Sequence, residues 1–164
     1  MIFLGVLKAV VSAILNMLSG YGHKDPFIDF INNAINDIAS MRVGYCMMKE
    51  LPIKQWVSEH CLALARVFPY VFGHYTKRFG PSANSNRRED WKRDVTCLQQ
   101  MVNSFHVMAA SLMSRDNVEV SVIERNIKIF LSCCEEFGST VLKNPFWETK
   151  VRLRCYAMVF NVIN

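Results

Sequence analysis

Two apolar heptad stripes, separated by a short polar break, constrain the fold of this chain more than any other feature. The first stripe recurs every three or four residues from Trp91 to Leu112, and the second does so from Val120 to Phe137. This spacing is typical of amphipathic α-helices. The break, Ser114 to Asn117, is so short that the two helices must form an antiparallel hairpin. Gly138 predicts the end of the second helix, since glycine readily adopts the left-handed conformation there.

The rest of the chain is predicted to pack as helices against this hairpin. With 164 residues, of which 51% are apolar, the chain can bury the core of one domain. We therefore predict an all-α fold: a single irregular bundle of five to six helices organised on the hairpin at about residues 89–138. The domain would span residues 1–164, with a flexible linker near 80–88, where glycine, proline, serine and asparagine gather.

Met1 to Ser19 is apolar almost throughout and has three interpretations. Its few polar or small residues recur at three or four positions and form one narrow line on a helix: Gly5, Lys8, Ser12, Asn16 and Ser19. A core or partner-binding helix with one line facing water explains that line best. The alternatives are a membrane anchor, for which the segment is barely long enough, and a signal peptide, which would lack a basic leader.

Further helices are predicted on both sides of the linker. Asp25 and Pro26 favour a helix that begins near Phe27, with Asp25 as its cap. Ile53 to Phe68 has the spacing of another amphipathic helix. Asn144 to Phe146 predicts a turn, and we expect a helix from Trp147 to Asn164, although alternate residues there are apolar, as in a strand.

The cysteines indicate a reducing compartment. All six lie in apolar stretches without a CxxC pair, so we expect small buried side chains with free thiols rather than three disulfides: Cys46, Cys61, Cys97, Cys133, Cys134 and Cys155. The predicted location is cytoplasmic or nuclear, and the alternative is a membrane.

One cationic cluster is a candidate contact for nucleic acid or another anion. Six cations lie within seventeen residues around the linker: Lys77, Arg78, Arg87, Arg88, Lys92 and Arg93. Lysine and arginine can bind phosphates, and Trp91 among them could stack on a base. However, Glu89, Asp90 and Asp94 offset half of this charge, which favours a solvated helix start.

No catalytic, cofactor or metal motif is present in the sequence. His60 and Cys61 are adjacent, so on a helix their side chains diverge by about 100° instead of converging on a metal. There is no glycine-rich phosphate loop, GxSxG or HExxH. The sequence therefore predicts a protein that is not an enzyme and uses no cofactor.

The run IERNIKIFLSCCEEFGSTVLKNPFWETK, Ile123 to Lys150, resembles a segment of uncharacterised proteins predicted from animal genomes within or beside mobile elements. In those proteins an FLSCC-like helix precedes a PFW turn. The resemblance implies a nuclear or cytoplasmic accessory role and assigns no functional residue. After Lys150 the sequence departs from that pattern.

The leading functional hypothesis is a non-enzymatic interaction or scaffold domain whose partner is another protein. Nine methionines and eleven phenylalanines exceed the needs of a small core, and such residues suit adaptable binding surfaces. The alternatives are a membrane-associated protein anchored by residues 1–19 and a nucleic-acid-binding accessory protein that uses the cluster at 77–93.

Overall fold

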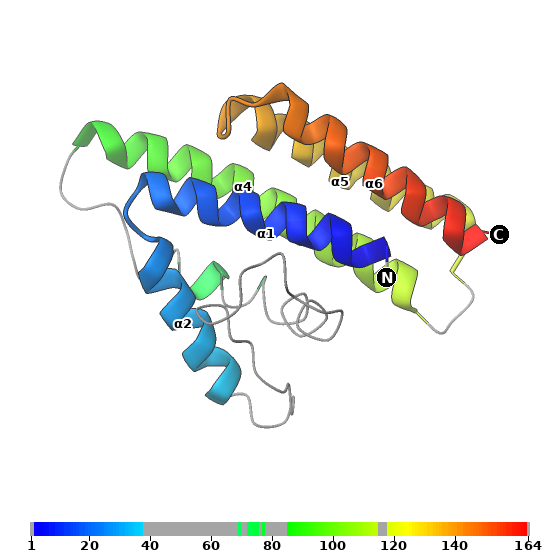
Figure 1. Ribbon diagram of the computed structural model, residues 1–164, viewed down its shortest axis with the longest axis horizontal. Coiled ribbons are helices and arrows are strands. Elements are labelled where there is room, and N and C mark those ends of the chain that lie inside the picture. The colour runs from blue at the N-terminus through cyan, green and yellow to red at the C-terminus, as the bar shows by residue number, and fades with distance from the viewer. Residues whose placement is uncertain are drawn as a thin grey trace. The chain divides into compact units, whose positions relative to one another are not determined.

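The computed structural model describes residues 2–37, 69, 72–75, 77, 85–114 and 118–163, which include five α-helices and no strand (Figure 1). The predicted all-α fold is confirmed. The chain divides into two compact units, residues 1–91 and 92–164, with the boundary inside helix α4. The helix predicted at Ile53 to Phe68 lies outside the described residues.

Helix α1, Ile2–Gly20, has the burial that the sequence predicts for a core helix. Ser12, Asn16 and Ser19 are exposed along one line, and Gly5 and Lys8 are half-buried on it. Nine apolar side chains on the other faces are at most 7% exposed: Val6, Leu7, Val10, Val11, Ala13, Ile14, Leu15, Met17 and Leu18. Among the described residues, no helix has both the length and the apolar character needed to cross a membrane.

Helix α2, Lys24–Asp37, begins three residues earlier than predicted. The Phe27 amide already donates to the His23 carbonyl oxygen, so Asp25 lies in the first turn and does not cap the helix from outside. Pro26 is tolerated there because amides of the first turn have no intrahelical acceptor. Gly22, with φ 74°, makes the sharp turn from α1.

An aromatic cluster ties this turn to later residues of the first unit. The Tyr75 ring is fully buried and lies 4.9 Å from the Phe27 ring, and its hydroxyl lies 2.9 Å from Nδ1 of His23. Tyr21 and His23 also contact Trp91, with ring centroids 4.9 and 5.0 Å away. Aromatic rings therefore make up much of the core beside this turn.

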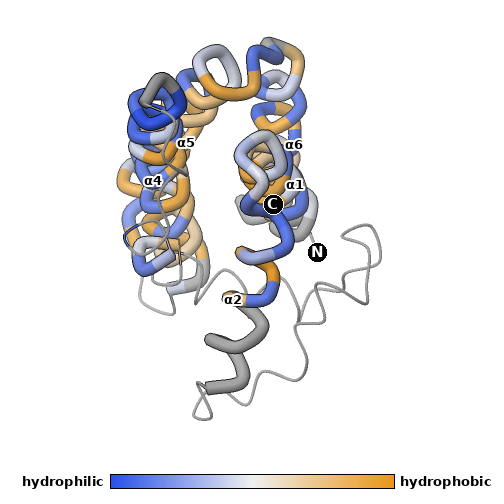
Figure 2. Tube along the Cα trace, turned by 90° about the vertical axis from the view of Figure 1, so that its left-hand side faces the viewer, coloured by the Kyte–Doolittle hydropathy of each residue, from blue (hydrophilic) through white to orange (hydrophobic). Residues whose placement is uncertain are grey.

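Helices α4, Ser85–Met113, and α5, Val120–Thr140, carry the two predicted stripes and form an antiparallel hairpin (Figure 1). The Phe105 and Phe130 rings meet edge to face at 5.5 Å. Along both helices, apolar positions recur between polar ones (Figure 2). Because α4 begins at Ser85, residues 85–88 of the predicted linker are helical; residues 78–84 and the break at 115–117 lie outside the described residues.

Gly138 does not end α5, contrary to the prediction. The helix continues to Thr140, and the left-handed residue is Lys143, with φ 51°. Gly138 is buried, and a Cβ atom there would lie 3.3 Å from Cε3 of Trp147 and 3.5 Å from the Asn144 carbonyl oxygen. The glycine therefore allows the start of the next helix to pack closely on α5.

Helix α6, Pro145–Ile163, confirms the predicted C-terminal helix and packs against α5. Asn144 begins it: its Oδ1 accepts a hydrogen bond from the Phe146 amide at 3.1 Å, and Pro145 occupies the first helical position. The side chains of Val151 and Cys155 are fully buried. Trp147 contacts Phe137, with ring centroids 5.7 Å apart.

Candidate interaction surface

Most of the described cations of the predicted cluster lie in the first three turns of α4. Arg87 and Arg88 are both exposed on α4 but, as neighbours, they point about 100° apart. Lys77 and Lys92 are also exposed, and Arg78 lies outside the described residues. Within the described part of this cluster, Arg88 and Lys92 lie one helical turn apart, which is typical of a solvated helix face.

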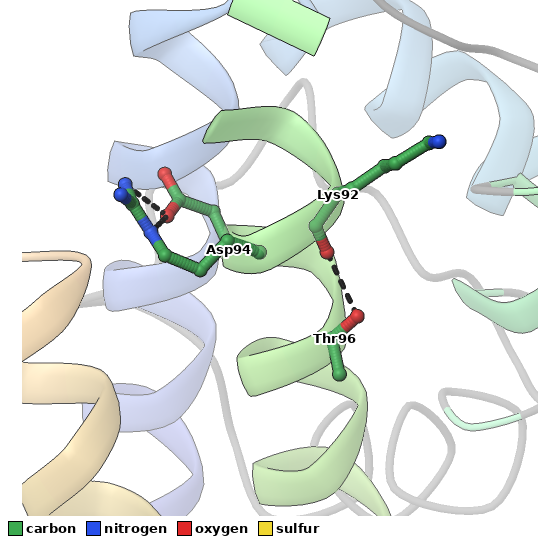
Figure 3. Close-up of polar contacts among 4 residues, drawn as sticks. Lys92, Asp94 and Thr96 are labelled. Carbon is green, nitrogen blue, oxygen red and sulfur yellow. Dashed lines mark hydrogen bonds and ion pairs between the residues drawn. The ribbon is translucent and has the colours of Figure 1, made fainter. Parts of the chain in front are cut away.

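Arg93 is held by its neighbour Asp94. Its Nε and Nη2 atoms donate to Oδ1 of Asp94 at 3.0 and 2.9 Å, and the Asp94 side chain is 9% exposed. Lys92 and Asp94 project to opposite sides of α4, and the Thr96 hydroxyl donates to the Lys92 carbonyl oxygen (Figure 3). The guanidinium of Arg93 therefore offsets a mostly buried carboxylate.

A depression of about 300 Å³ between α4 and α5 has mixed charge. Lys92 and Arg93 line it together with Glu136, and uncharged residues complete it: Thr96, Cys97, Gln100 and Thr140. The carboxylate offsets part of the positive potential that would attract a phosphate. The geometry of this depression gives no built anion site.

The four described cysteines are free, as predicted; Cys46 and Cys61 lie outside the described residues, as does His60. Burial raises the pKa of Cys97 to about 11 and that of Cys155 to about 12, and it also raises the pKa of the Cys134 thiol. Protonated thiols are poor nucleophiles and poor metal ligands. No group of three metal-ligating side chains occurs among the described residues.

The most exposed row of large apolar side chains on one helix face of the described chain lies on α6 and includes one threonine; we call it the α6 stripe: Phe146, Thr149, Leu153 and Tyr156. Its three large members are 74%, 64% and 56% exposed, in chain order. The four positions alternate steps of three and four residues, so they share one helix face. That face lies about 180° from Val151 and Cys155, which are fully buried.

Other exposed apolar residues of the second unit do not extend this stripe. Val107, Val120 and Ile129 are 50–56% exposed, but they belong to α4 or α5. Single exposed apolar residues are normal on protein surfaces, whereas large contiguous apolar patches are typical of interaction sites.

The sequence analysis missed the α6 stripe because α6 is apolar on two opposite faces. Residues two apart on a helix differ by about 200°, so Val151 and Cys155 lie on one face and Leu153 on the other. In the sequence this arrangement reads as the alternation of a strand. The signal that could have found the stripe is the heptad spacing from Phe146 to Tyr156.

Cations border the α6 stripe. Lys150 and Arg154 are exposed one helical turn apart along one edge. Along the other edge Arg152 is bound to Glu148 and lies 3.9 Å from Glu135, measured from Nη2 to Oε2. Exposed cationic side chains therefore border one edge of the stripe, and an Arg152–Glu148 ion pair borders the other.

Comparison with known proteins adds no assignment: no family model, curated protein or solved structure matches the chain.

Proposed function

We propose that the protein is a non-enzymatic interaction domain that binds another protein through the α6 stripe. The observation that carries the proposal is the exposure of Phe146, Leu153 and Tyr156 on one helix face. Aromatic and aliphatic anchors of this kind contribute most of the binding energy in protein interfaces. Burying one such side chain in a complex stabilises it by about 1.5 to 3 kcal/mol.

The alternatives have less support from the structure. An anchor at Met1 to Ser19 would need its apolar side chains for lipid, yet those described in α1 are buried in the protein. A nucleic-acid contact at residues 77–93 would use cations without local partners, yet Arg93 binds Asp94 and the neighbours Arg87 and Arg88 point about 100° apart.

Site-specific photo-crosslinking tests the proposed function. Benzoylphenylalanine replaces Leu153 in the full chain. This variant is expressed in the protein's native cells, which are then irradiated. We expect a discrete adduct with another protein, because the stripe would lie against its partner. Ile129 is the matched control position, since it is 50% exposed but lies on α5 outside the stripe.

Mass spectrometry of the adduct distinguishes the outcomes. A partner peptide crosslinked at position 153 and absent at position 129 supports the proposal. Lack of an adduct at 153, or equal adducts at the two positions, contradicts it. An adduct between two copies of the chain would make the α6 stripe a self-association surface.

A further inference from the structure

We infer that the first two turns of α5, residues 120–126, open as a local unit while the remainder of α5 stays helical. We call these residues the α5 start. The inference concerns the hairpin and does not depend on the proposed function. Three observations carry it: the α5 start has no side-chain cap, it contributes no apolar side chain to the core, and it ends at a buried amide without a partner.

The missing cap weakens the end of the helix. Glu119 precedes α5, and its side chain accepts no hydrogen bond from an amide of the first turn. Its Oε2 atom instead accepts a hydrogen bond from the Ser121 hydroxyl at 3.2 Å. In α6, by contrast, Oδ1 of Asn144 accepts a hydrogen bond from the Phe146 amide at 3.1 Å. Amides of the first turn have no acceptor within the helix, and a side-chain cap typically favours the folded end about 5-fold.

The α5 start makes little apolar contact with the rest of the protein. The buried residues of α5 begin at Asn126, and the buried apolar ones begin at Ile127. Val120 is 56% exposed, and Ile123 is half-buried. Helices in proteins owe most of their stability to the packing of an apolar face. Little packing therefore holds the α5 start in place.

Asn126 is the third observation. The residue is 8% exposed, and no residue in the described part of the chain forms a hydrogen bond with its side-chain amide. Ser104 is also buried, but its hydroxyl donates to the Met101 carbonyl oxygen at 2.9 Å. A buried amide without a partner has lost its hydrogen bonds to water and gained none in exchange. Opening returns the Asn126 amide to water, so this residue favours the open form.

The remainder of α5 is held firmly from Ile127 onward. Ile127 is 5% exposed, and the fully buried Phe130 ring meets the Phe105 ring of α4 at 5.5 Å. Further along, the Phe137 ring contacts the Trp147 ring of α6. Opening beyond Ile127 would expose these apolar side chains to water, which is unfavourable. The local opening therefore ends there.

A segment with two accessible forms can act as a conformational device. Elements that change structure on binding are drawn from the parts of a protein with low local stability. A partner that binds only the helical form of the α5 start would close it, and a partner that binds the extended chain would hold it open. The hairpin therefore has one fixed end and one end whose structure a partner can change.

Hydrogen exchange of the full chain, measured by nuclear magnetic resonance, tests the inference. The amides of residues 124–127 in α5 are compared with those of residues 149–152 in α6, which are the fifth to eighth residues of each helix. In an α-helix, amides at these positions donate to the carbonyl group four residues earlier. After correction for intrinsic rates, we expect the amides of residues 124–127 to exchange at least about 10-fold faster.

A pair of Asn→Leu variants tests the role of the buried amide. Asn126→Leu should slow the exchange of residues 124–127 by at least about 5-fold, because it replaces an unsatisfied buried amide with an apolar side chain of similar size. Asn103→Leu is the matched control, since Asn103 is exposed on α4. It should change these exchange rates by less than about 2-fold.

The comparison within the parent protein decides the inference even if a variant does not fold. Equal protection of residues 124–127 and 149–152 overturns it, and faster exchange of the first group supports it. Unchanged exchange in Asn126→Leu, or equal slowing in Asn103→Leu, would contradict the role of Asn126 in the opening.

Discussion

At the scale of single residues, burial raises the pKa of several ionisable groups in the described chain. Cys155 and Cys134 are fully buried, and Cys97 is 5% exposed. Tyr75 is also fully buried, and burial raises its pKa to about 12. In each group the neutral form is favoured, because a thiolate or phenolate loses its hydration in the core.

These shifts predict that stability falls at alkaline pH. A group whose folded pKa lies above its unfolded pKa contributes stability that is complete below the unfolded pKa and lost as the pH rises through the folded pKa. For Cys155 the window runs from the ordinary value of 9.0 to about 12. Each such group should lower the free energy of unfolding by up to about 1.4 kcal/mol per pH unit in its window.

Urea unfolding at several pH values above neutrality measures this loss. Cys155→Ala should show a shallower decline of unfolding free energy with pH than the parent, because one titrating group is absent. Ser132→Ala, at an exposed position of α5, should leave the slope unchanged. A free energy of unfolding that stays constant as the pH rises from 9.0 to about 12 would contradict the assignment of these thiols to the core. Identical slopes for Cys155→Ala and the parent would also contradict it.

At the scale of elements, the sequence predicts helices well wherever one apolar stripe faces one core. The central parts of the stripes on α4 and α5 are buried as predicted: Leu98, Phe105, Ile127 and Phe130 are all at most 5% exposed. Val120, predicted to begin the second stripe, is instead 56% exposed. Prediction from the sequence is wrong where a residue type is compatible with two structural roles. Gly138 can end a helix or admit a close neighbour, and only the contact with Trp147 decides between them.

The hairpin contact predicts coupling between Phe105 and Phe130. Phe→Leu at either position should lower the free energy of unfolding by about 0.5 to 2 kcal/mol, a moderate change that leaves the protein folded. Because the two rings meet edge to face, the double variant should lose less than the sum of the two single variants by about 0.5 to 1.5 kcal/mol. Urea denaturation of the four proteins of the cycle gives the coupling energy.

Trp91 provides the control for this cycle. It lies on the same helix, fourteen residues and about 21 Å from Phe105. Trp91→Leu combined with Phe105→Leu should be additive within about 0.5 kcal/mol, as for sites without shared partners. Additivity in the Phe105–Phe130 pair as well would show that the two stripes do not face each other as described.

At the scale of the whole molecule, the burial of α1 favours a core helix over an anchor for the apolar N-terminal segment. Composition alone could not separate a core helix from an anchor, because both are apolar along most of their length. A core helix has its apolar side chains covered by the protein, whereas an anchor has them covered by lipid. Which of the two occurs depends on residues that are distant in the sequence. The predicted polar line was informative because a narrow exposed line implies that every other face of α1 is covered.

Neighbouring substitutions in α1 test that interpretation. Val11 is 1% exposed and Ser12 is exposed, so Val11→Asp places a carboxylate in the core whereas Ser12→Asp places it in water. Val11→Asp should lower the free energy of unfolding by at least about 3 kcal/mol, and Ser12→Asp by no more than about 0.5 kcal/mol. Circular dichroism during urea unfolding measures both. If α1 were instead an anchor outside the folded core, Val11→Asp would weaken membrane binding while both variants unfolded at the same urea concentration as the parent.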